Sequence, residues 1–312
     1  MRLCVLFVLA VGLCSSQPTI KVDVHLVNVA FSVRDERGAL VMNLNKDDVE
    51  VFEDGIPQDI SFFSRSADVP LTIGLIVDVS GSQDHFDKQH RRDLRVFLKS
   101  VLGPRDRAFL VTFGNRVRLL SDLTGVSDEI VDRLDGRGRE DRRPRHDEVP
   151  ELGPPGEIRE LGTAFYDAIY YSITEKLAKA EGARRAVILF SDGEDNSSAH
   201  HMLDAIEEAQ RENVLCFSLR YTQTEHGRLT ARNKYGTSVI ERLAQETGAL
   251  DFDARQGDLR KHFEEIGDVL RSSYELAYRS TQGAGDGTFR KITIRAKRPG
   301  LTVRTKTGYF AR

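Results

Sequence analysis

The stretch Leu71–Ser82 reads LTIGLIVDVSGS and decides the expected fold of the chain. An apolar run that contains one glycine leads directly to Asp78, Ser80 and Ser82. A short apolar run without polar alternation is typical of a strand that is buried on both faces, as in parallel sheets. In open α/β sheets, ligands bind just beyond the carboxyl ends of such strands. The stretch therefore predicts a crevice that receives one carboxylate and two hydroxyl groups.

After Asp78 the chain alternates helical and strand patterns. Apolar residues recur at helical spacing from Leu94 to Leu102, the strand Arg107–Phe113 follows, and Arg116–Leu120 is expected to fold back beside it. The later expected elements are a helix over 163–180, a strand over 186–190, a helix over 199–211, a strand over 214–219, a helix over 236–247, a short strand over 249–252 and a helix over 257–272. Strands that alternate with helices of this length predict a doubly wound, mostly parallel, Rossmann-like α/β sheet.

Both ends of the chain carry strand patterns instead. Alternation from Ile20 changes phase at Val27, which predicts a bulge or bend, and turn sequences lie at residues 35–38 and 54–55. Strands are also expected over 274–278, 289–296 and 301–309. We therefore expect a small antiparallel β domain built from residues 17–69 and a C-terminal hairpin at 281–312, with the α/β domain at 70–280.

The first residues resemble a secretion signal. Arg2 precedes the apolar run Leu3–Leu13, and small residues follow up to Ser16, so residues 1–16 are expected to be a cleaved signal peptide. A lipoprotein signal through Cys14 is the weaker alternative, because Leu13 stands before it. The run is too short to span a bilayer, and no other segment contains 18 consecutive apolar residues. A secreted, periplasmic or cell-surface protein without a transmembrane segment is expected.

Charge and cysteine content exclude several classes of function. The formal net charge of −3 provides no field for nucleic acid, and the charges of the long connection at 136–160 are mixed, so this segment is expected to be a solvated arm. Cys216 is the one cysteine beyond the signal and is expected to be a small buried apolar residue. Oligomeric state is not determined by these features.

Two more stretches supply oxygen side chains to the same edge of the expected sheet. Asp192 follows the apolar strand that ends at Ser191, and Thr163 lies where a loop opens a helix. With Asp78, Ser80 and Ser82 they form a set of five oxygen ligands without cysteine or histidine, which favours Mg²⁺, Mn²⁺ or Ca²⁺ over Zn²⁺. Because three of the five ligands are neutral hydroxyls, such an ion would remain able to accept a carboxylate from outside.

These residues resemble the metal-ion-dependent adhesion site of von Willebrand factor A-type domains. The resemblance rests on Asp78-Val79-Ser80-Gly81-Ser82, Thr163 and Asp192-Gly193, and it covers residues 70–280. It implies that the serines and the threonine bind one divalent cation, Mg²⁺ first, that the aspartates bind directly or through water, and that a partner's Asp or Glu completes the shell. The flanking sequences, among them GTAFYDAIYYS and the closing GYF, are similar to acidobacterial-type secreted A-domain proteins. The connection at 136–160 departs from that pattern and is expected to overhang the metal.

The expected function is therefore metal-dependent binding of an acidic group on a protein or peptide, without catalytic residues. A structural module, in which the metal only joins three loops, is one alternative. A hydrolase that uses the same ion to activate water is another, with Glu194 or Asp195 as the base. His85, His90, His200 and His201 are expected on solvated helix starts rather than in a second metal site.

Overall fold

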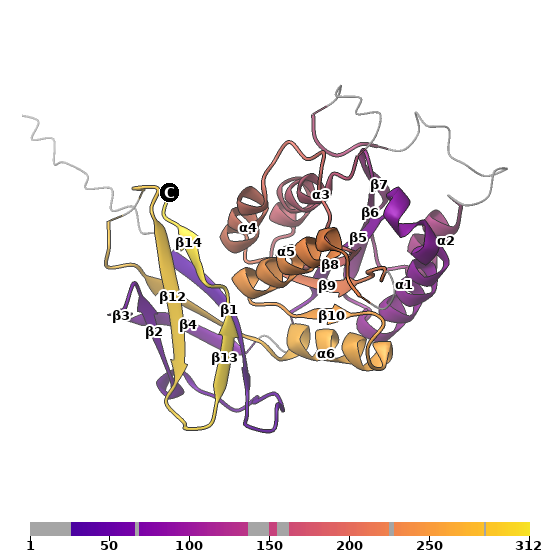
Figure 1. Cartoon of the computed structure of the whole chain (residues 1–312). Helices are drawn as coiled ribbons and strands as arrows, with labels where there is room; N and C mark the ends of the chain where they lie inside the picture. Colours follow the sequence, from indigo (N-terminus) through magenta and orange to yellow (C-terminus); the bar gives the residue numbers. More distant parts are fainter. Residues whose placement is uncertain (1–25, 66–68, 137–149, 155–161, 225–227, 284) are drawn as a thin grey trace, which may run out of the picture.

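An α/β domain and a β sandwich lie side by side in the structure (Figure 1). The computed structural model describes residues 26–65, 69–136, 150–154, 162–224, 228–283 and 285–312. The expected signal peptide and most of the charged connection at 136–160 lie outside these residues. Among the described helices, none has the length and apolar character needed to cross a membrane.

A six-stranded sheet in the order β10-β9-β8-β5-β6-β7 forms the centre of the α/β domain. Its strands pair in parallel, except that β7 runs antiparallel to β6. The strands are β5 (Leu71–Asp78), β6 (Arg107–Phe113), β7 (Val117–Thr124), β8 (Arg184–Ser191), β9 (Leu215–Arg220) and β10 (Asp251–Asp253). All eight residues of β5 are buried, as its unbroken apolar run predicts. The expected fold class, a doubly wound and mostly parallel sheet, is confirmed.

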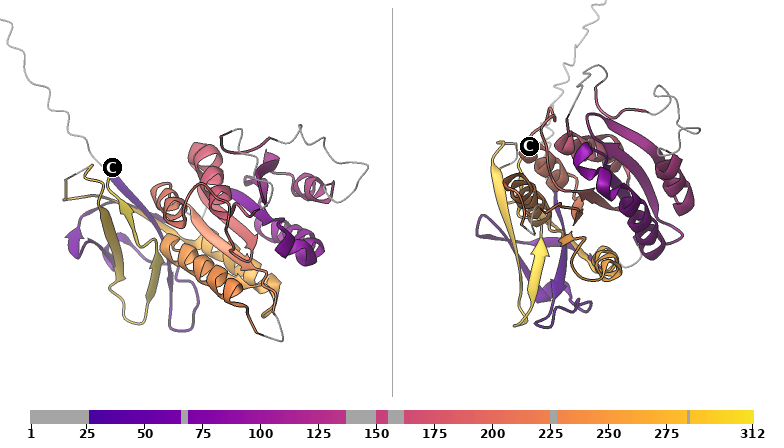
Figure 2. Two further views of the ribbon diagram at one scale, coloured as in Figure 1. Left: turned by 45° about the horizontal axis from the view of Figure 1, so that its top comes forward. Right: turned by 45° about the vertical axis from the view of Figure 1, so that its right-hand side comes forward.

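Helices cover both faces of this sheet (Figure 2). Apolar residues of α1 (Asp87–Val101), α2 (Ser127–Gly136) and α6 (Leu259–Ser272) pack on the face that contains Ile73 and Leu75 of β5. The opposite face, which contains Ile76, is covered by α3 (Phe165–Tyr171), α4 (Met202–Arg211) and α5 (Ala231–Thr247). The single helix expected over 163–180 is α3 followed by a π-helical turn and a 3-10 turn. The helix α2 was not expected.

Two four-stranded sheets form the sandwich, with the orders β13-β1-β11-β4 and β14-β12-β2-β3. Their strands are β1 (Leu26–Arg34), β2 (Val49–Glu53), β3 (Ile56–Gln58), β4 (Ile60–Arg65), β11 (Tyr274–Arg279), β12 (Phe289–Ala296), β13 (Thr302–Thr305) and β14 (Gly308–Phe310). One apolar core, which includes Val29, Tyr274 and Ile294, joins the two sheets. Antiparallel strands from both chain ends thus share a core, and β11, which directly follows α6, pairs with β1 and β4.

The turns expected at residues 54–55 and 35–38 are both present. Asp54 and Gly55 both have positive φ, 50° and 84°, between β2 and β3. This is the backbone of a tight primed turn, for which Asp-Gly is a preferred sequence. Residues 35–38 also turn, since the amide of Gly38 donates to the carbonyl of Asp35 over 2.9 Å. The alternating residues expected before the phase change at Val27 lie outside the described residues, which begin with β1 at Leu26.

Candidate metal centre

The loop after β5 brings its three oxygen side chains together. The backbone amide of Ser80 donates to Oδ1 of Asp78 over 2.9 Å, which folds the loop back on the end of its strand. The hydroxyls of Ser80 and Ser82 then lie 3.1 Å apart, at the start of the 3-10 segment η2 (Gly81–Phe86). The tight turn therefore converts alternate sequence positions into one cluster of oxygen atoms.

Two hydrogen bonds join this loop to the end of the neighbouring strand β8. The hydroxyl of Ser82 donates to Oδ2 of Asp192 over 3.0 Å. The hydroxyl of Ser191 donates to Oδ2 of Asp78 over 2.7 Å. Because β5 and β8 are adjacent and parallel, their carboxyl ends meet, and residues more than a hundred positions apart in the chain come into contact.

Thr163 enters from the loop that precedes α3. The amide of the next residue, Ala164, donates to the carbonyl of Gly114 at the end of β6 over 2.8 Å. A Cβ atom on Gly114 would lie 3.7 Å from the amide nitrogen of Ser80, so this loop passes close to the Ser80 turn. Thr163 is buried. The structure thus links four of the five expected residues by hydrogen bonds and anchors the fifth to the adjacent strand end.

Residues after Asp192 hold the Thr163 loop in place. Asn196 accepts the amide of Thr163 at its Oδ1 over 2.7 Å and returns its own amide to the carbonyl of Thr163. Asp195 caps α3, because its Oδ1 accepts the amides of Phe165 and Tyr166. Sequence reasoning did not identify these positioning roles, because both residues lie about thirty positions after the start of α3 and not at its own N-cap position.

Gln83 is a further residue whose role was not identified from the sequence. It is buried, and its Nε2 donates to Oδ2 of Asp192 over 2.8 Å and to the carbonyl of Tyr221 over 3.1 Å. The side chain therefore ties Asp192 to the end of β9. Ser191 plays the corresponding role for Asp78, as described above. Neither residue belongs to a spacing that sequence alone relates to the site.

The two carboxylates of the site are buried without a positive partner among their described contacts. Asp78 is 1% exposed and Asp192 is 3% exposed, and the hydrogen bonds to both come from hydroxyls, amides and the carboxamide of Gln83. Burial, followed by repulsion from Asp192, raises the pKa of Asp78 to about 7. Two adjacent buried carboxylates with neutral donors create a demand for positive charge, which a divalent cation would meet. The donor set, oxygen alone, fits a hard cation.

The two acids that a hydrolytic mechanism would use as a base are both engaged elsewhere. Glu194 pairs with Arg232, and Asp195 holds the first turn of α3. Burial and then Asp192 raise the pKa of Glu194, while Arg232 opposes this shift. Neither carboxylate is therefore a free base beside the oxygen cluster.

The histidines do not add a second cluster. In the described part of the chain, no group of three or more His, Cys, Asp and Glu side chains could hold a metal ion. The expectation that His90 is solvated is wrong: it is 2% exposed among the rings of Phe86, Phe190 and Tyr221, and burial lowers its pKa to about 3. His200 is half-buried and its Nδ1 lies 2.8 Å from Asp167. Cys216 is buried, as expected.

Comparisons with known proteins give the following. No model of a known protein family matches the chain. No curated protein matches it either. Among solved structures, BatB from Bacteroides thetaiotaomicron has a TM-score of 0.46 at 16% identity, and the match covers 65% of this chain and 100% of BatB. The Rpn10 VWA domain has a TM-score of 0.41 at 12% identity, over 65% and 98% of the two chains.

A mussel byssus protein is a further neighbour. Proximal thread matrix protein 1, in a structure with a zinc-occupied MIDAS motif, has a TM-score of 0.48 at 15% identity, and the match covers 70% of this chain and 49% of that one. The neighbours thus include proteins with von Willebrand factor A-type domains. With these scores and identities, the assignment of the fold rests on strand order and register rather than on the neighbours.

Proposed function

We propose that the α/β domain is a von Willebrand factor A-type module that binds one divalent cation and uses it to capture an acidic side chain of a protein or peptide. Ser80, Ser82 and Thr163 would bind the ion directly, and Asp78 and Asp192 would bind it or hold its waters. Mg²⁺ is the proposed ion, with Mn²⁺ and Ca²⁺ as the next candidates. Secretion to the periplasm or the cell surface is part of the proposal and rests on the signal-like residues 1–16.

The observation that carries this proposal is the uncompensated charge of Asp78 and Asp192. Both are buried, and their described hydrogen-bond donors are neutral. An ion-free site would therefore keep two negative charges next to each other in a medium of low polarity, which is unfavourable. A divalent cation balances that charge, and the neighbouring serine hydroxyls offer further oxygen ligands.

The same charge count supports an acidic partner. Two carboxylates balance the charge of a divalent cation, and hydroxyl ligands add no further negative charge. Such an ion keeps enough positive character to accept one more carboxylate. Acidic ligands would then bind only in the presence of metal, because without it they would meet the negative charge of Asp78 and Asp192.

Calorimetric titration of Mg²⁺ into the metal-free protein tests the first half of the proposal. We expect binding by the wild type and an affinity at least about tenfold lower for Asp192→Asn. Asp47→Asn is the matched control, since this exposed aspartate lies in the sandwich. Absence of Mg²⁺, Mn²⁺ and Ca²⁺ binding by the wild type would contradict the proposal.

Capture of acidic peptides tests the second half. Immobilised peptides that contain Asp or Glu, and matched peptides with Asn or Gln, are incubated with the protein in Mg²⁺ or in EDTA. Retention by the acidic set alone, and only with metal, is the expected result. Metal binding without such retention would instead favour the structural module, in which the ion only joins the three loops.

A further inference from the structure

A pocket of about 250 Å³ lies where the C-terminal end of α4 meets the sandwich. Gln210 and Asn213 line it from the α4 side, and Arg290, Lys306 and Phe310 line it from the sandwich. The ten residues of α4 begin next to the loop that holds Asp192 and extend about 15 Å away from it, so this pocket is separate from the candidate metal centre.

Three buried polar groups on the pocket wall have unused hydrogen-bonding capacity within the described residues. Oε1 of Gln210 and Nε of Arg290 have no partner there, although these residues are 1% and 2% exposed. The ammonium of Lys306 can donate three hydrogen bonds, and the acceptors found are the carbonyl of Gln210 at 2.8 Å and Oδ1 of Asn213 at 2.6 Å. Buried polar groups are normally satisfied, so this combination at a cavity indicates a ligand.

The orientation of Gln210 shows which kind of atom it would contact. Its Nε2 donates to the carbonyl of Glu246 over 2.9 Å and to the hydroxyl of Thr307 over 3.1 Å, which fixes the amide plane. The free Oε1 is therefore an acceptor. A ligand at this position has to present an N–H or O–H group.

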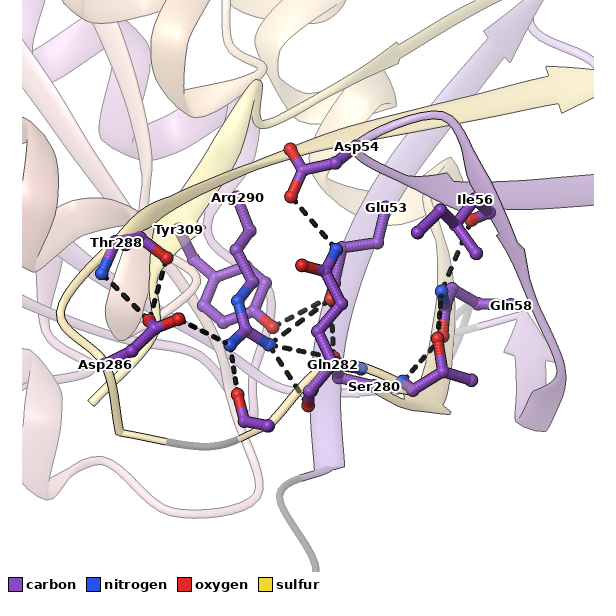
Figure 3. A network of polar contacts seen from close by, with 12 residues as sticks. Glu53, Asp54, Ile56, Gln58, Ser280, Gln282, Asp286, Thr288, Arg290 and Tyr309 are labelled. Atoms are coloured by element: carbon purple, nitrogen blue, oxygen red, sulfur yellow. Dashed lines mark hydrogen bonds and ion pairs between the residues drawn. The ribbon is translucent and has the colours of Figure 1, made fainter.

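Among the described cations that line the pocket, Lys306 is the one without a contacting carboxylate. Arg290 is paired with the fully buried Glu53, which also accepts a hydrogen bond from the hydroxyl of Tyr309 (Figure 3). The hydroxyl of Tyr278 donates to the same carboxylate. The two arginines at the rim pair with acidic residues of α4 and the position after it: Arg211 with Glu208 and Glu212, and Arg312 with Glu207. Burial lowers the pKa of Lys306 to about 7, and a bound anion would favour its charged form.

From this juxtaposition we propose that the pocket binds a small monocarboxylate that carries a hydrogen-bond donor next to the carboxylate and a short apolar group. The carboxylate would meet Lys306, the donor would meet Oε1 of Gln210, and the apolar group would pack on Val27 and Phe310. One unpaired cation matches one negative charge rather than the two of a phosphate. The C-terminal residue of a peptide has all three features, and a free small acid has the carboxylate and the apolar group.

Calorimetry on the full chain with three probes tests this proposal, in EDTA so that no metal-bound carboxylate contributes. The probes are N-acetylglycyl-leucine, its C-terminal amide, and 3-methylbutanoate, which lacks the N–H group. We expect the first to bind and each of the other two to bind at least about tenfold more weakly. Absence of binding by all three up to about 10 mM would overturn the proposal, as would equal binding of acid and amide. Equal binding of 3-methylbutanoate would overturn the contact with Gln210.

Variants locate the binding. Lys306→Met removes the charge at similar length and is expected to weaken acid binding at least about tenfold, while Lys261→Met, an exposed lysine on α6, leaves it unchanged. Ala311 also lines the pocket, and Ala311→Leu adds bulk to its wall while it keeps the lysine, so it should abolish binding. Asp192→Asn should bind the acid as the wild type does, which separates this pocket from the proposed metal function. Unchanged binding by both Lys306→Met and Ala311→Leu would place the acid elsewhere and overturn the proposal.

Discussion

At the scale of single residues, the candidate site is defined by the way in which Asp78 is buried. Its carboxylate accepts hydrogen bonds from the amide of Ser80 and the hydroxyl of Ser191, and both favour the charged form. Burial and the negative charge of Asp192 outweigh them, and the pKa of Asp78 is about 7. The side chain is thus held where its negative charge is unfavourable unless a cation is bound.

This shift predicts how the stability of the metal-free protein depends on pH. The folded-state pKa of Asp78 lies above the ordinary value of 3.8, so the folded state binds more protons between these values and loses stability as pH rises through 7. From pH 5 to pH 7.5 the loss from this residue amounts to about 2.5 kcal/mol. Asp78→Asn should lack it, as measured by urea unfolding in EDTA at both pH values.

Two comparisons make that measurement decisive. Asp47→Asn should keep the pH dependence of the wild type, because it leaves the buried pair intact. Saturating Mg²⁺ should remove most of the difference between the wild type at pH 5 and at pH 7.5. If the free energy of unfolding changes equally with pH in the wild type and in Asp78→Asn in EDTA, the burial of this carboxylate does not destabilise the folded state.

At the scale of elements, the strand ends and the loops between them assemble the site. The segment Asp192–Ser198 lies along the start of α3 and exchanges hydrogen bonds with it through Asp195, Asn196 and Ser198. Each of these bonds fixes Thr163 relative to the ends of β5 and β8. The geometry of the oxygen cluster therefore depends on residues that provide none of its oxygen atoms.

Asn196→Ala tests this dependence. The substitution removes the acceptor of the Thr163 amide, a hydrogen bond of 2.7 Å, and leaves that amide without its side-chain partner. We expect the free energy of unfolding to fall by about 1–2 kcal/mol and Mg²⁺ affinity to fall about tenfold. Asn43→Ala, which removes an exposed hydrogen bond to Arg298 in the sandwich, is the control for the change in Mg²⁺ affinity. Unchanged Mg²⁺ affinity would mean that Thr163 is held by its other contacts alone.

The turn after Asp192 is also fixed by its contact with α5. Gly193 has a φ of 80°, and a Cβ there would lie 2.4 Å from the carbonyl oxygen of Gly236. Gly55 has a similar φ of 84°, but a Cβ would meet nothing within 4 Å. Alanine at Gly55 should therefore cost only the backbone strain, about 1 kcal/mol, and alanine at Gly193 a further 1–3 kcal/mol or so from the clash. Equal losses in chemical unfolding would contradict the close approach.

Local patterns in the sequence predicted the parts of the fold that depend on local order. The apolar runs of β5 and β8 gave strands buried on both faces, and Asp54-Gly55 gave the hairpin turn. The helix α2 was not predicted: it is ten residues long, and its apolar face is limited to Ile130, Val131 and Leu134. The placement of Gln83 and Asn196 could not be predicted, since their partners lie at sequence separations of 109 and 33 residues and are set by tertiary packing.

The resemblance to von Willebrand factor A-type domains implied roles for the site residues, which the periodicity of the sequence does not indicate. Residue types alone allowed many α/β sites for Asp78, Ser80 and Ser82. The strand and loop pattern added Thr163 and Asp192 to the same edge of the sheet, and the resemblance implied that the five residues share one metal ion. The structure brings these positions to one edge of the sheet. It also buries His90, which helical spacing on α1 would have revealed: His90 stands four residues before Leu94 and therefore on the buried face.

At the scale of the whole molecule, both chain ends close the sandwich, and the C-terminal strands rest on the α/β domain. The amide of Thr307 donates to the carbonyl of Glu246 over 3.1 Å, and Arg304 donates to the carbonyl of Ala249 over 2.8 Å. Gly248 ends α5 with a φ of 82°, and a Cβ there would lie 2.7 Å from the backbone of Thr305. Backbone contacts of this kind fix how the two parts of the molecule meet.

Lys306 lies at this junction, and its burial predicts a second dependence of stability on pH, opposite in sign to that of Asp78. Burial lowers the folded-state pKa of its amine to about 7 from an ordinary 10.5, so the unfolded state binds more protons between these values and stability rises with pH across that range. Between pH 7 and pH 9.5 the gain from this residue is about 3 kcal/mol. Lys306→Met should therefore be stabilised relative to the wild type most at pH 7, and the advantage should shrink by that amount at pH 9.5.

Chemical unfolding of the two proteins at both pH values, in the absence of carboxylic acids, measures this change. Lys306→Met also removes the hydrogen bonds to the carbonyl of Gln210 and Oδ1 of Asn213, and this loss lowers stability equally at both pH values. The change in the stability difference between pH 7 and pH 9.5 therefore reports only the cost of burying the charge. Lys261→Met should show no such difference, because that lysine is exposed. If the stability difference between Lys306→Met and the wild type is the same at both pH values, the ammonium is not desolvated at the junction. The junction would then hold Lys306 through its bonds to Gln210 and Asn213 without a penalty that an anion could relieve.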